Sequence, residues 1–157
     1  SEPVESAAFQ LLNVMFSVPQ ISVRLEEIPA SHQKMLKFWM SFWNLHSKTL
    51  MGSNIQPLYP DKSYPIVYSS TEKECIVGVY QSHLIVDISE QFKNKNIYVI
   101  NSTATDKVTV NNLNPMTTMK LKIFDCQGNT IKYQQITLKG GLTEFKVPPS
   151  GLLELTN

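Results

Sequence analysis

The chain has 157 residues, of which 42% are hydrophobic and 17% charged, and its 14 basic side chains nearly balance the 13 acidic ones. This length and apolar content exclude a disordered chain and allow one domain, or one domain with an appendage. A net charge of +1 gives no electrostatic reason to expect binding to nucleic acid or to an anionic membrane surface. No apolar run approaches the roughly 18–20 residues that cross a bilayer.

The first segment with a helical pattern covers residues 3–17. Proline is tolerated in a first helical turn, and Glu5 favours the positive end of the helix dipole. Four large apolar side chains recur on one face, at Phe9, Leu12, Met15 and Phe16. We expect the helix to end at Val18-Pro19, because proline lacks the backbone N–H that would continue the ladder.

A second, longer helix is predicted over residues 31–51, with Ser31 as its N-cap and Gly52 just past its end. One broad apolar stripe consists of Met35, Leu36, Trp39, Phe42, Trp43 and Leu50. Phe38, Met40 and Leu45 widen that stripe well beyond a single face. Buried tryptophan and phenylalanine side chains each cover roughly 150–250 Å², and exposed together they would form a large adhesive patch. We therefore expect Trp39, Phe42, Trp43 and Leu50 to form an interface with a further domain.

After Gly52 the period changes from helical to alternating, which divides the chain into a helical segment, 1–52, and a strand-rich segment, 53–157. The expected strands are 54–58, 65–70, 74–81, 83–88, 96–102, 106–111, 117–125, 130–138, 142–147 and 151–156. The alternation is clearest in Met119-Lys-Leu121-Lys-Ile123. Ten short strands separated by turns, with no helix between them, predict a mainly β fold, an antiparallel β-sandwich preceded by two helices.

No pattern in the sequence predicts catalysis, a cofactor or a metal site. The three histidines lie in separate elements without neighbouring ligands. Glu26 and Glu27 are adjacent and indicate a solvated turn, and Asp87, Asp106 and Asp125 flank strands as turn residues do. The two cysteines, Cys75 and Cys126, could form at most one bridge, and we expect both to be free thiols.

Aromatic side chains suggest a second interpretation, because sugar rings stack on flat aromatic faces. Tyr59 and Tyr64 bracket a turn and are the tyrosines that we expect to be exposed together as a sugar contact. The chain could then be a carbohydrate-binding module. In a third interpretation it is a free-standing interaction domain that binds a partner or a second copy of itself through an exposed aromatic helix.

Residues 7–80 resemble the junction between catalytic barrel and C-terminal domain in α-galactosidase (melibiase)-like glycoside hydrolases. The matching order begins with a helix ending Met15-Phe16-Ser17-Val18-Pro19, then Ser22-Val23-Arg24-Leu25. It continues with a helix carrying Phe38-Trp39-Met40-Ser41-Phe42-Trp43-Asn44-Leu45-His46, then Leu50-Met51-Gly52, and closes with Ile55-Gln-Pro-Leu58 and Tyr64-Pro65.

The resemblance implies that 1–52 is the remnant of a (β/α)₈ barrel and 53–157 its C-terminal β-sandwich. The parent would hydrolyse terminal α-galactosides or related α-linked oligo- or polysaccharides by a retaining mechanism with two carboxylates and no metal. The family's two catalytic aspartates lie upstream on barrel strands, and no position here matches either motif. Since the chain begins at Ser1 without an initiator methionine, we expect a native chain that starts earlier. The sequence indicates no cellular compartment.

Overall fold

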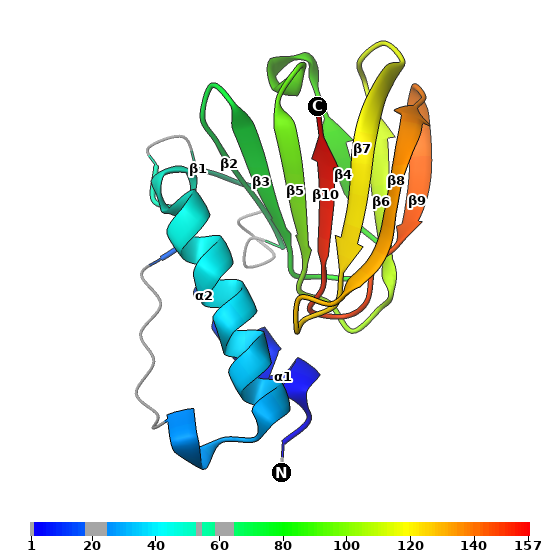
Figure 1. Cartoon of the computed structure of the whole chain (residues 1–157). Coiled ribbons are helices and arrows are strands. Elements are labelled where there is room, and N and C mark those ends of the chain that lie inside the picture. The colour runs from blue at the N-terminus through cyan, green and yellow to red at the C-terminus, as the bar shows by residue number, and fades with distance from the viewer. Residues whose placement is uncertain (1, 18–24, 53–54, 59–64) are drawn as a thin grey trace.

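Two helices precede ten strands in a computed structural model that describes residues 2–17, 25–52, 55–58 and 65–157 (Figure 1). The α-helices are α1, Val4–Leu12, and α2, Ala30–Leu50, with short 3₁₀ turns at Leu25–Glu27 and Glu90–Phe92. The first five strands are β1 Ile55–Leu58, β2 Ile66–Ser70, β3 Glu74–Val79, β4 Ile85–Ile88 and β5 Asn96–Asn101. The others are β6 Lys107–Asn112, β7 Thr117–Phe124, β8 Thr130–Leu138, β9 Gly141–Lys146 and β10 Leu152–Thr156. The predicted mainly β fold with two leading helices is confirmed.

Helix α1 is shorter than the predicted 3–17. Its regular ladder stops at Leu12, and the backbone continues in tight turns in which Val14 N–H donates to the Leu11 carbonyl and Met15 N–H to the Leu12 carbonyl. These turns still bring Met15 into the same buried cluster as Leu12. Three of the four predicted face residues, Leu12, Met15 and Phe16, therefore pack in or against this cluster, although Met15 and Phe16 are not α-helical and Phe9 is only half-buried.

Helix α2 begins one residue before its predicted N-cap. Pro29 occupies the N-cap position, where its fixed φ suits the entry to a helix, and no side chain caps this end. Ser31 thus lies inside the first turn, and its hydroxyl is 3.3 Å from Nδ1 of His32. The prediction of Ser31 as N-cap is wrong because Pro29 starts the helix earlier.

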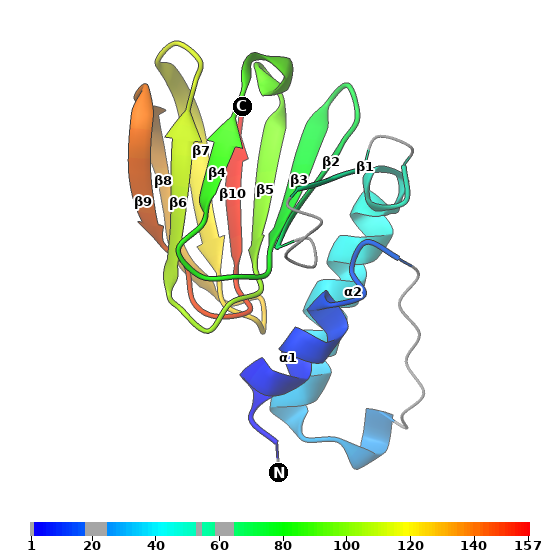
Figure 2. The same cartoon turned by 180° about the vertical axis from the view of Figure 1, so that it is seen from behind.

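The strands form a seven-stranded sheet in the order β1-β2-β3-β5-β10-β7-β8 and a three-stranded sheet in the order β4-β6-β9. Figure 2 shows the smaller sheet in front of the larger one. Two neighbouring pairs, β3 with β5 and β4 with β6, are parallel, so the expectation of purely antiparallel sheets does not hold for them. The chain leaves the larger sheet after β3, forms β4 in the smaller sheet, and re-enters the larger sheet as β5, which runs in the same direction as β3. In the same way, β5 in the larger sheet separates the parallel strands β4 and β6 of the smaller sheet.

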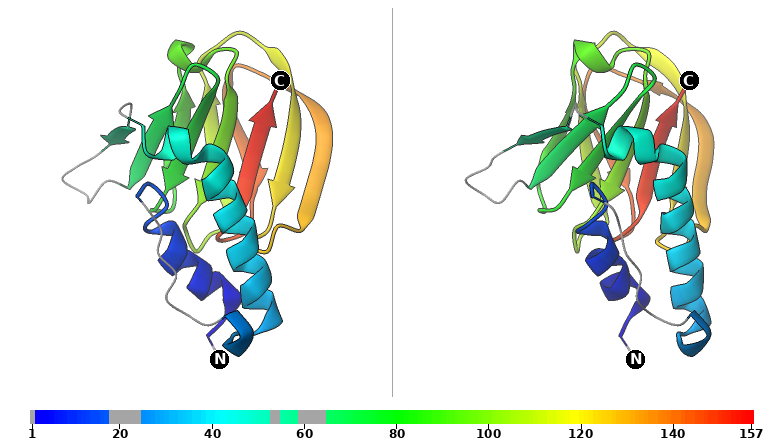
Figure 3. Two further views of the ribbon diagram at one scale, coloured as in Figure 1. Left: turned by 60° about the vertical axis from the view of Figure 1, so that its left-hand side comes forward. Right: turned by 90° about the vertical axis from the view of Figure 1, so that its left-hand side faces the viewer.

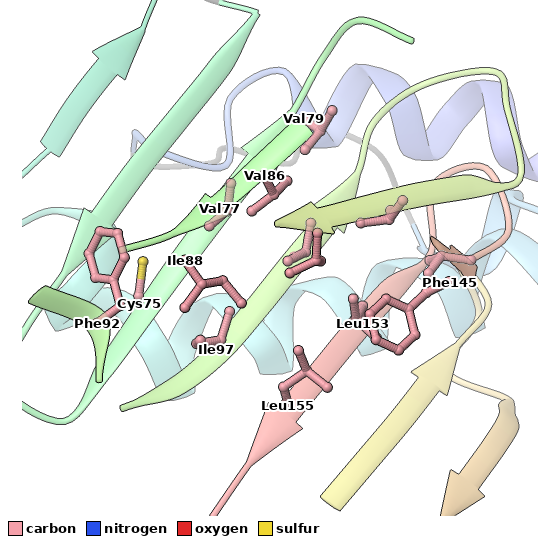
Figure 4. Close-up of a cluster of buried hydrophobic side chains, with 14 of the residues drawn as sticks. Cys75, Val77, Val79, Val86, Ile88, Phe92, Ile97, Phe145, Leu153 and Leu155 are labelled. Atoms are coloured by element: carbon pink, nitrogen blue, oxygen red, sulfur yellow. The ribbon is translucent and has the colours of Figure 1, made fainter. Parts of the chain in front are cut away.

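The sandwich core lies between the two sheets. Alternate residues of β3, β5 and β10 point into it, among them Val77, Ile97 and Leu153, and meet Ile88 and Phe145 of the smaller sheet (Figure 4). The opposite faces of the same strands are also apolar, and there Ile76, Ile100 and Leu152 join a second cluster with the helices. Strands buried on both faces explain why this part of the sequence contains long apolar runs.

Candidate functional site at the helix–sheet interface

Helix α2 lies across the outer face of the seven-stranded sheet (Figure 3). Of the four predicted interface residues, Trp39, Phe42 and Leu50 are buried and Trp43 is half-buried. The sheet and α1 cover most of the aromatic side of α2 within this chain. The residues that remain fully exposed on α2 are mainly polar, and Leu45, 78% exposed, is an exception.

Aromatic rings form a continuous series along this interface. The Trp39 ring contacts Phe38 at a centroid distance of 4.9 Å and Phe42 at 5.6 Å, both edge to face. Phe42 in turn lies 4.4 Å from the His46 ring and 6.0 Å from Tyr98 of β5. Edge-to-face pairs add stabilisation beyond the area that they bury, so the series fixes α2 in one orientation on the sheet.

A buried polar cluster anchors the C-terminal half of α2. His46, 5% exposed, places Nδ1 2.9 Å from one carboxylate oxygen of Glu74 and 3.1 Å from the other. The Thr49 hydroxyl donates to the same carboxylate, and the Ser69 hydroxyl of β2 donates to the Thr49 carbonyl. We call His46, Thr49 and Glu74 the anchor cluster. Because residues 46 and 49 are one helical turn apart, both side chains reach β3 together.

The carboxyl group of Glu74 has a lowered pKa. Burial alone would raise it, but hydrogen bonds with His46 and Thr49, together with the charge of His46, outweigh that effect. The anionic form is therefore favoured where the helix docks. In the anchor cluster, the Glu74 carboxylate of β3 thus holds His46 and Thr49 of α2 against the sheet, which is a structural contact.

Glu154 of β10 lies beside this cluster and has the opposite shift. Burial raises its pKa, while Lys122, its cross-strand neighbour on β7, and His46 act in the other direction. Burial, followed by the nearby charges of Glu154 and Glu74, also raises the pKa of the Tyr98 hydroxyl to about 12. Tyr98 is therefore a neutral, packed side chain at neutral pH.

Replacing Glu154 with glutamine should raise the free energy of unfolding at neutral pH. A carboxyl group whose pKa is higher in the folded state destabilises the fold as pH rises through that value. Below the ordinary carboxyl pKa the side chain at position 154 is neutral in both proteins, and the difference in their free energies of unfolding should disappear. Urea denaturation of the two proteins across this pH range measures the difference, and equal stabilities at neutral pH would contradict the prediction.

Three hydrogen bonds fix the segment around α1 to the rest of the chain. Trp43 donates its indole N–H to the Ser17 carbonyl at 2.9 Å. Tyr80, which follows β3, donates its hydroxyl to the Leu12 carbonyl at 2.9 Å, and burial raises its pKa well above the usual range. Ser150 donates its hydroxyl to the carbonyl of Glu5 at 3.1 Å. The Tyr80 and Ser150 bonds, together with the second apolar cluster, join the helical segment to the strand-rich one.

The other candidate residues do not gather at this interface. Tyr59 and Tyr64, the predicted sugar contact, lie outside the described residues. Asp125 accepts hydrogen bonds from the backbone of Gln127 and Asn129, both at 2.9 Å, which is the turn role expected of it. In the described part of the chain, no three histidine, cysteine or acidic side chains are arranged to hold a metal ion.

Both cysteines are free, as predicted, and both are buried. Cys75 belongs to the core between the sheets, whereas Cys126 belongs to the cluster beneath the helices. Burial raises the pKa of Cys75 to about 12 and that of Cys126 to about 11. Neither thiol is therefore ionised at neutral pH, and the seven-stranded sheet separates them.

We expect a thiol-specific disulfide reagent to label neither cysteine in the native protein and both after denaturation. The thiolate is the reactive form, and these thiols are both protonated and covered. Absorbance of the released chromophore, with and without guanidinium chloride, gives the number of labelled thiols per chain. Rapid labelling of a native thiol would contradict the burial described here.

Sequence reasoning missed the anchor cluster. The sequence gives the three histidines no neighbouring ligand, and Glu74 opens an ordinary strand, so neither His46 nor Glu74 stands out. The position of His46 and Thr49 on the apolar side of the helix could have indicated the cluster, because two buried polar side chains need a hydrogen-bond partner.

Comparison with protein-family models, with curated proteins and with solved structures found no match to this chain. Among the described helices, none combines the length and the apolar character that a bilayer crossing requires.

Proposed function

We propose that this chain is a non-catalytic supporting part of a glycoside hydrolase that acts on terminal α-galactosides or related α-linked sugars. In this proposal residues 1–52 are the closing helices of the catalytic barrel, and 53–157 are the C-terminal sandwich that packs on it. The partner of this chain is the upstream barrel of the same polypeptide, and sugar is bound through the parent enzyme.

The observation that carries the proposal is the docking of α2 on the outer face of the sandwich. A helix, a glycine and then a strand that enters a β-sandwich follow one another here in the order that the family resemblance implies. Leu36, Met40 and Trp43 lie at helical spacing on α2 and are only partly buried, so the described residues leave room for further packing. Neighbouring barrel helices would cover this stripe.

The direct test is to sequence the reading frame upstream of the Ser1 codon and to assay the encoded protein on aryl α-galactosides. We expect a barrel sequence with two strand-end aspartates, and hydrolysis with retention of the anomeric configuration. This chain alone should show no hydrolysis. An upstream frame without those aspartates, or a full-length product inactive on α-linked sugars, would contradict the proposal.

A titration separates the supporting role from carbohydrate binding. Calorimetry of the chain with raffinose or galactomannan should show no saturable heat if the role is structural. Saturable binding that is lost in Tyr64→Ala would favour the carbohydrate-binding module. A stable, specific dimer at low concentration that Leu45→Lys disrupts would favour the interaction domain, because Leu45 is the most exposed large apolar side chain of α2.

A further inference from the structure

The end of β5 and the turn after it contain the sequence Asn101-Ser102-Thr103. An asparagine followed by any residue except proline, and then by serine or threonine, is the acceptor pattern for N-linked glycosylation. No other asparagine of the sequence has this pattern. Such acceptors normally lie in exposed loops. Here all three residues are buried, with exposed fractions of 0% for Asn101, 7% for Ser102 and 5% for Thr103.

The side-chain amide of Asn101 joins two parts of the chain that are distant in sequence. Its Nδ2 donates to the carbonyls of Thr105, Val147 and Pro148, at 2.8, 2.9 and 3.2 Å. Its Oδ1 accepts hydrogen bonds from the backbone N–H and the hydroxyl of Thr103, at 3.2 and 2.7 Å. This one amide group therefore closes the turn after β5 and also holds the segment that leads into β10.

Glycosylation needs the same nitrogen atom. The transfer forms a bond between Nδ2 and C1 of the first sugar and breaks the bond between C1 and a phosphate oxygen, so that a lipid pyrophosphate leaves and the nitrogen loses one proton. In the folded chain both hydrogens of this nitrogen are shared among three carbonyls, and Asn101 has no exposed surface. A sugar on Nδ2 would remove one of these hydrogens and leave buried carbonyls without a donor.

Two of the three carbonyls belong to residues that are made much later than Asn101. Val147 and Pro148 follow it by 46 and 47 residues. At about 5–20 residues per second, synthesis reaches them roughly 2–9 s after Asn101. Until then the Asn101 amide lacks these partners, and its nitrogen is open to a transferase.

We propose that Asn101 is a latent N-glycosylation site. The unfolded chain accepts an oligosaccharide from a lipid pyrophosphate donor at Nδ2, whereas the folded chain does not, and a chain glycosylated at Asn101 cannot complete the fold described above. Folding and modification are thus mutually exclusive outcomes for one nitrogen atom. This property is independent of the proposed role in a hydrolase.

The first test compares the native full chain with a synthetic peptide of residues 96–107, which carries the same pattern without the fold. Both are incubated with a purified single-subunit oligosaccharyltransferase and dolichyl-pyrophosphate-linked oligosaccharide, and intact mass gives the glycosylated fraction. The peptide should be modified at Asn101. The native chain should react at least about a thousandfold more slowly, because only its unfolded fraction presents the amide. The matched control is Ile131→Thr, which creates the acceptor pattern at the exposed Asn129, and that site should be modified in the native chain.

The second test asks whether a glycosylated chain can fold. The full chain is translated behind a signal peptide in the presence of microsomes, so that Asn101 meets the transferase before residues 147–148 are made. Limited trypsin should digest the molecules glycosylated at Asn101 at least about tenfold faster than the unglycosylated molecules of the same preparation. In Ile131→Thr, molecules that carry a glycan at Asn129 alone should remain as resistant as unglycosylated ones.

Any of four results would overturn the proposal. Two concern the acceptor: a peptide that is not modified, or a full chain that gains no glycan at Asn101 in microsomes. The third is modification of the native chain at the rate of the peptide. The fourth is equal trypsin resistance of the chains with and without a glycan at Asn101, which would show that the modification and the fold are compatible.

Discussion

Replacing Trp39 with alanine should lower the free energy of unfolding by about 3–5 kcal/mol, the usual loss when a buried aromatic side chain is deleted. Trp39 has no exposed surface and contacts both Phe38 and Phe42. Its indole N–H is buried without a hydrogen-bond partner among the described residues, and the alanine variant no longer buries that donor. We therefore expect a loss toward the lower end of the range, measured by urea denaturation.

The matched control is Leu45→Ala on the same helix. Leu45 is exposed, so its truncation should change the free energy of unfolding by no more than about 0.5 kcal/mol. Trp39→Phe should cost less than Trp39→Ala, because a phenyl ring keeps part of the packing and removes the unpaired N–H. Equal stabilities of wild type and Trp39→Ala would show that α2 does not dock on the sheet as described.

Replacing Glu74 with alanine should lower the free energy of unfolding by about 2–3 kcal/mol at neutral pH. The variant leaves the His46 ring and the Thr49 hydroxyl buried without the carboxylate that they contact. Glu72, which is exposed in the turn before the same strand, provides the control, and Glu72→Ala should be nearly neutral. A neutral effect of Glu74→Ala would mean that the anchor cluster does not stabilise the docked helix.

The Glu74 contribution should depend on pH in a defined direction. Its pKa in the folded protein lies below the ordinary value of 4.5, so its stabilisation is complete above that value. The stabilisation is lost as pH falls through the lower, folded-state pKa. The difference between wild type and Glu74→Ala should therefore be larger at about pH 7 than at about pH 3. A difference that grew on acidification would contradict the assigned direction.

Much of this fold could be predicted from local patterns. Each of the ten strands was expected within a few residues of its observed bounds, because turn residues separate the strands and the apolar pattern changes after Gly52. Helix α2 was expected at 31–51 and is found at Ala30–Leu50. These features depend on neighbouring residues, which is why the sequence alone reveals them.

Features that depend on distant residues could not be predicted. The parallel pairing of β3 with β5 follows from the sheet to which β4 belongs, and no local pattern encodes that choice. The same holds for the partner of His46, which is 28 residues away on β3. The sequence indicates that α2 has a broad apolar side to bury. It does not indicate which sheet packs against that side.

The position of β10 has a consequence for the order in which the fold can form. Leu152–Thr156 follows β7, β8 and β9 in the chain, yet it lies in the middle of the larger sheet, between β5 and β7. The β7–β8 hairpin therefore cannot join the rest of that sheet until β10 has been inserted. During synthesis β5 and β7 keep exposed edges until residues 152–156 have been made, and partly folded chains with exposed strand edges are prone to aggregate. Completion of this sheet thus depends on residues 152–156.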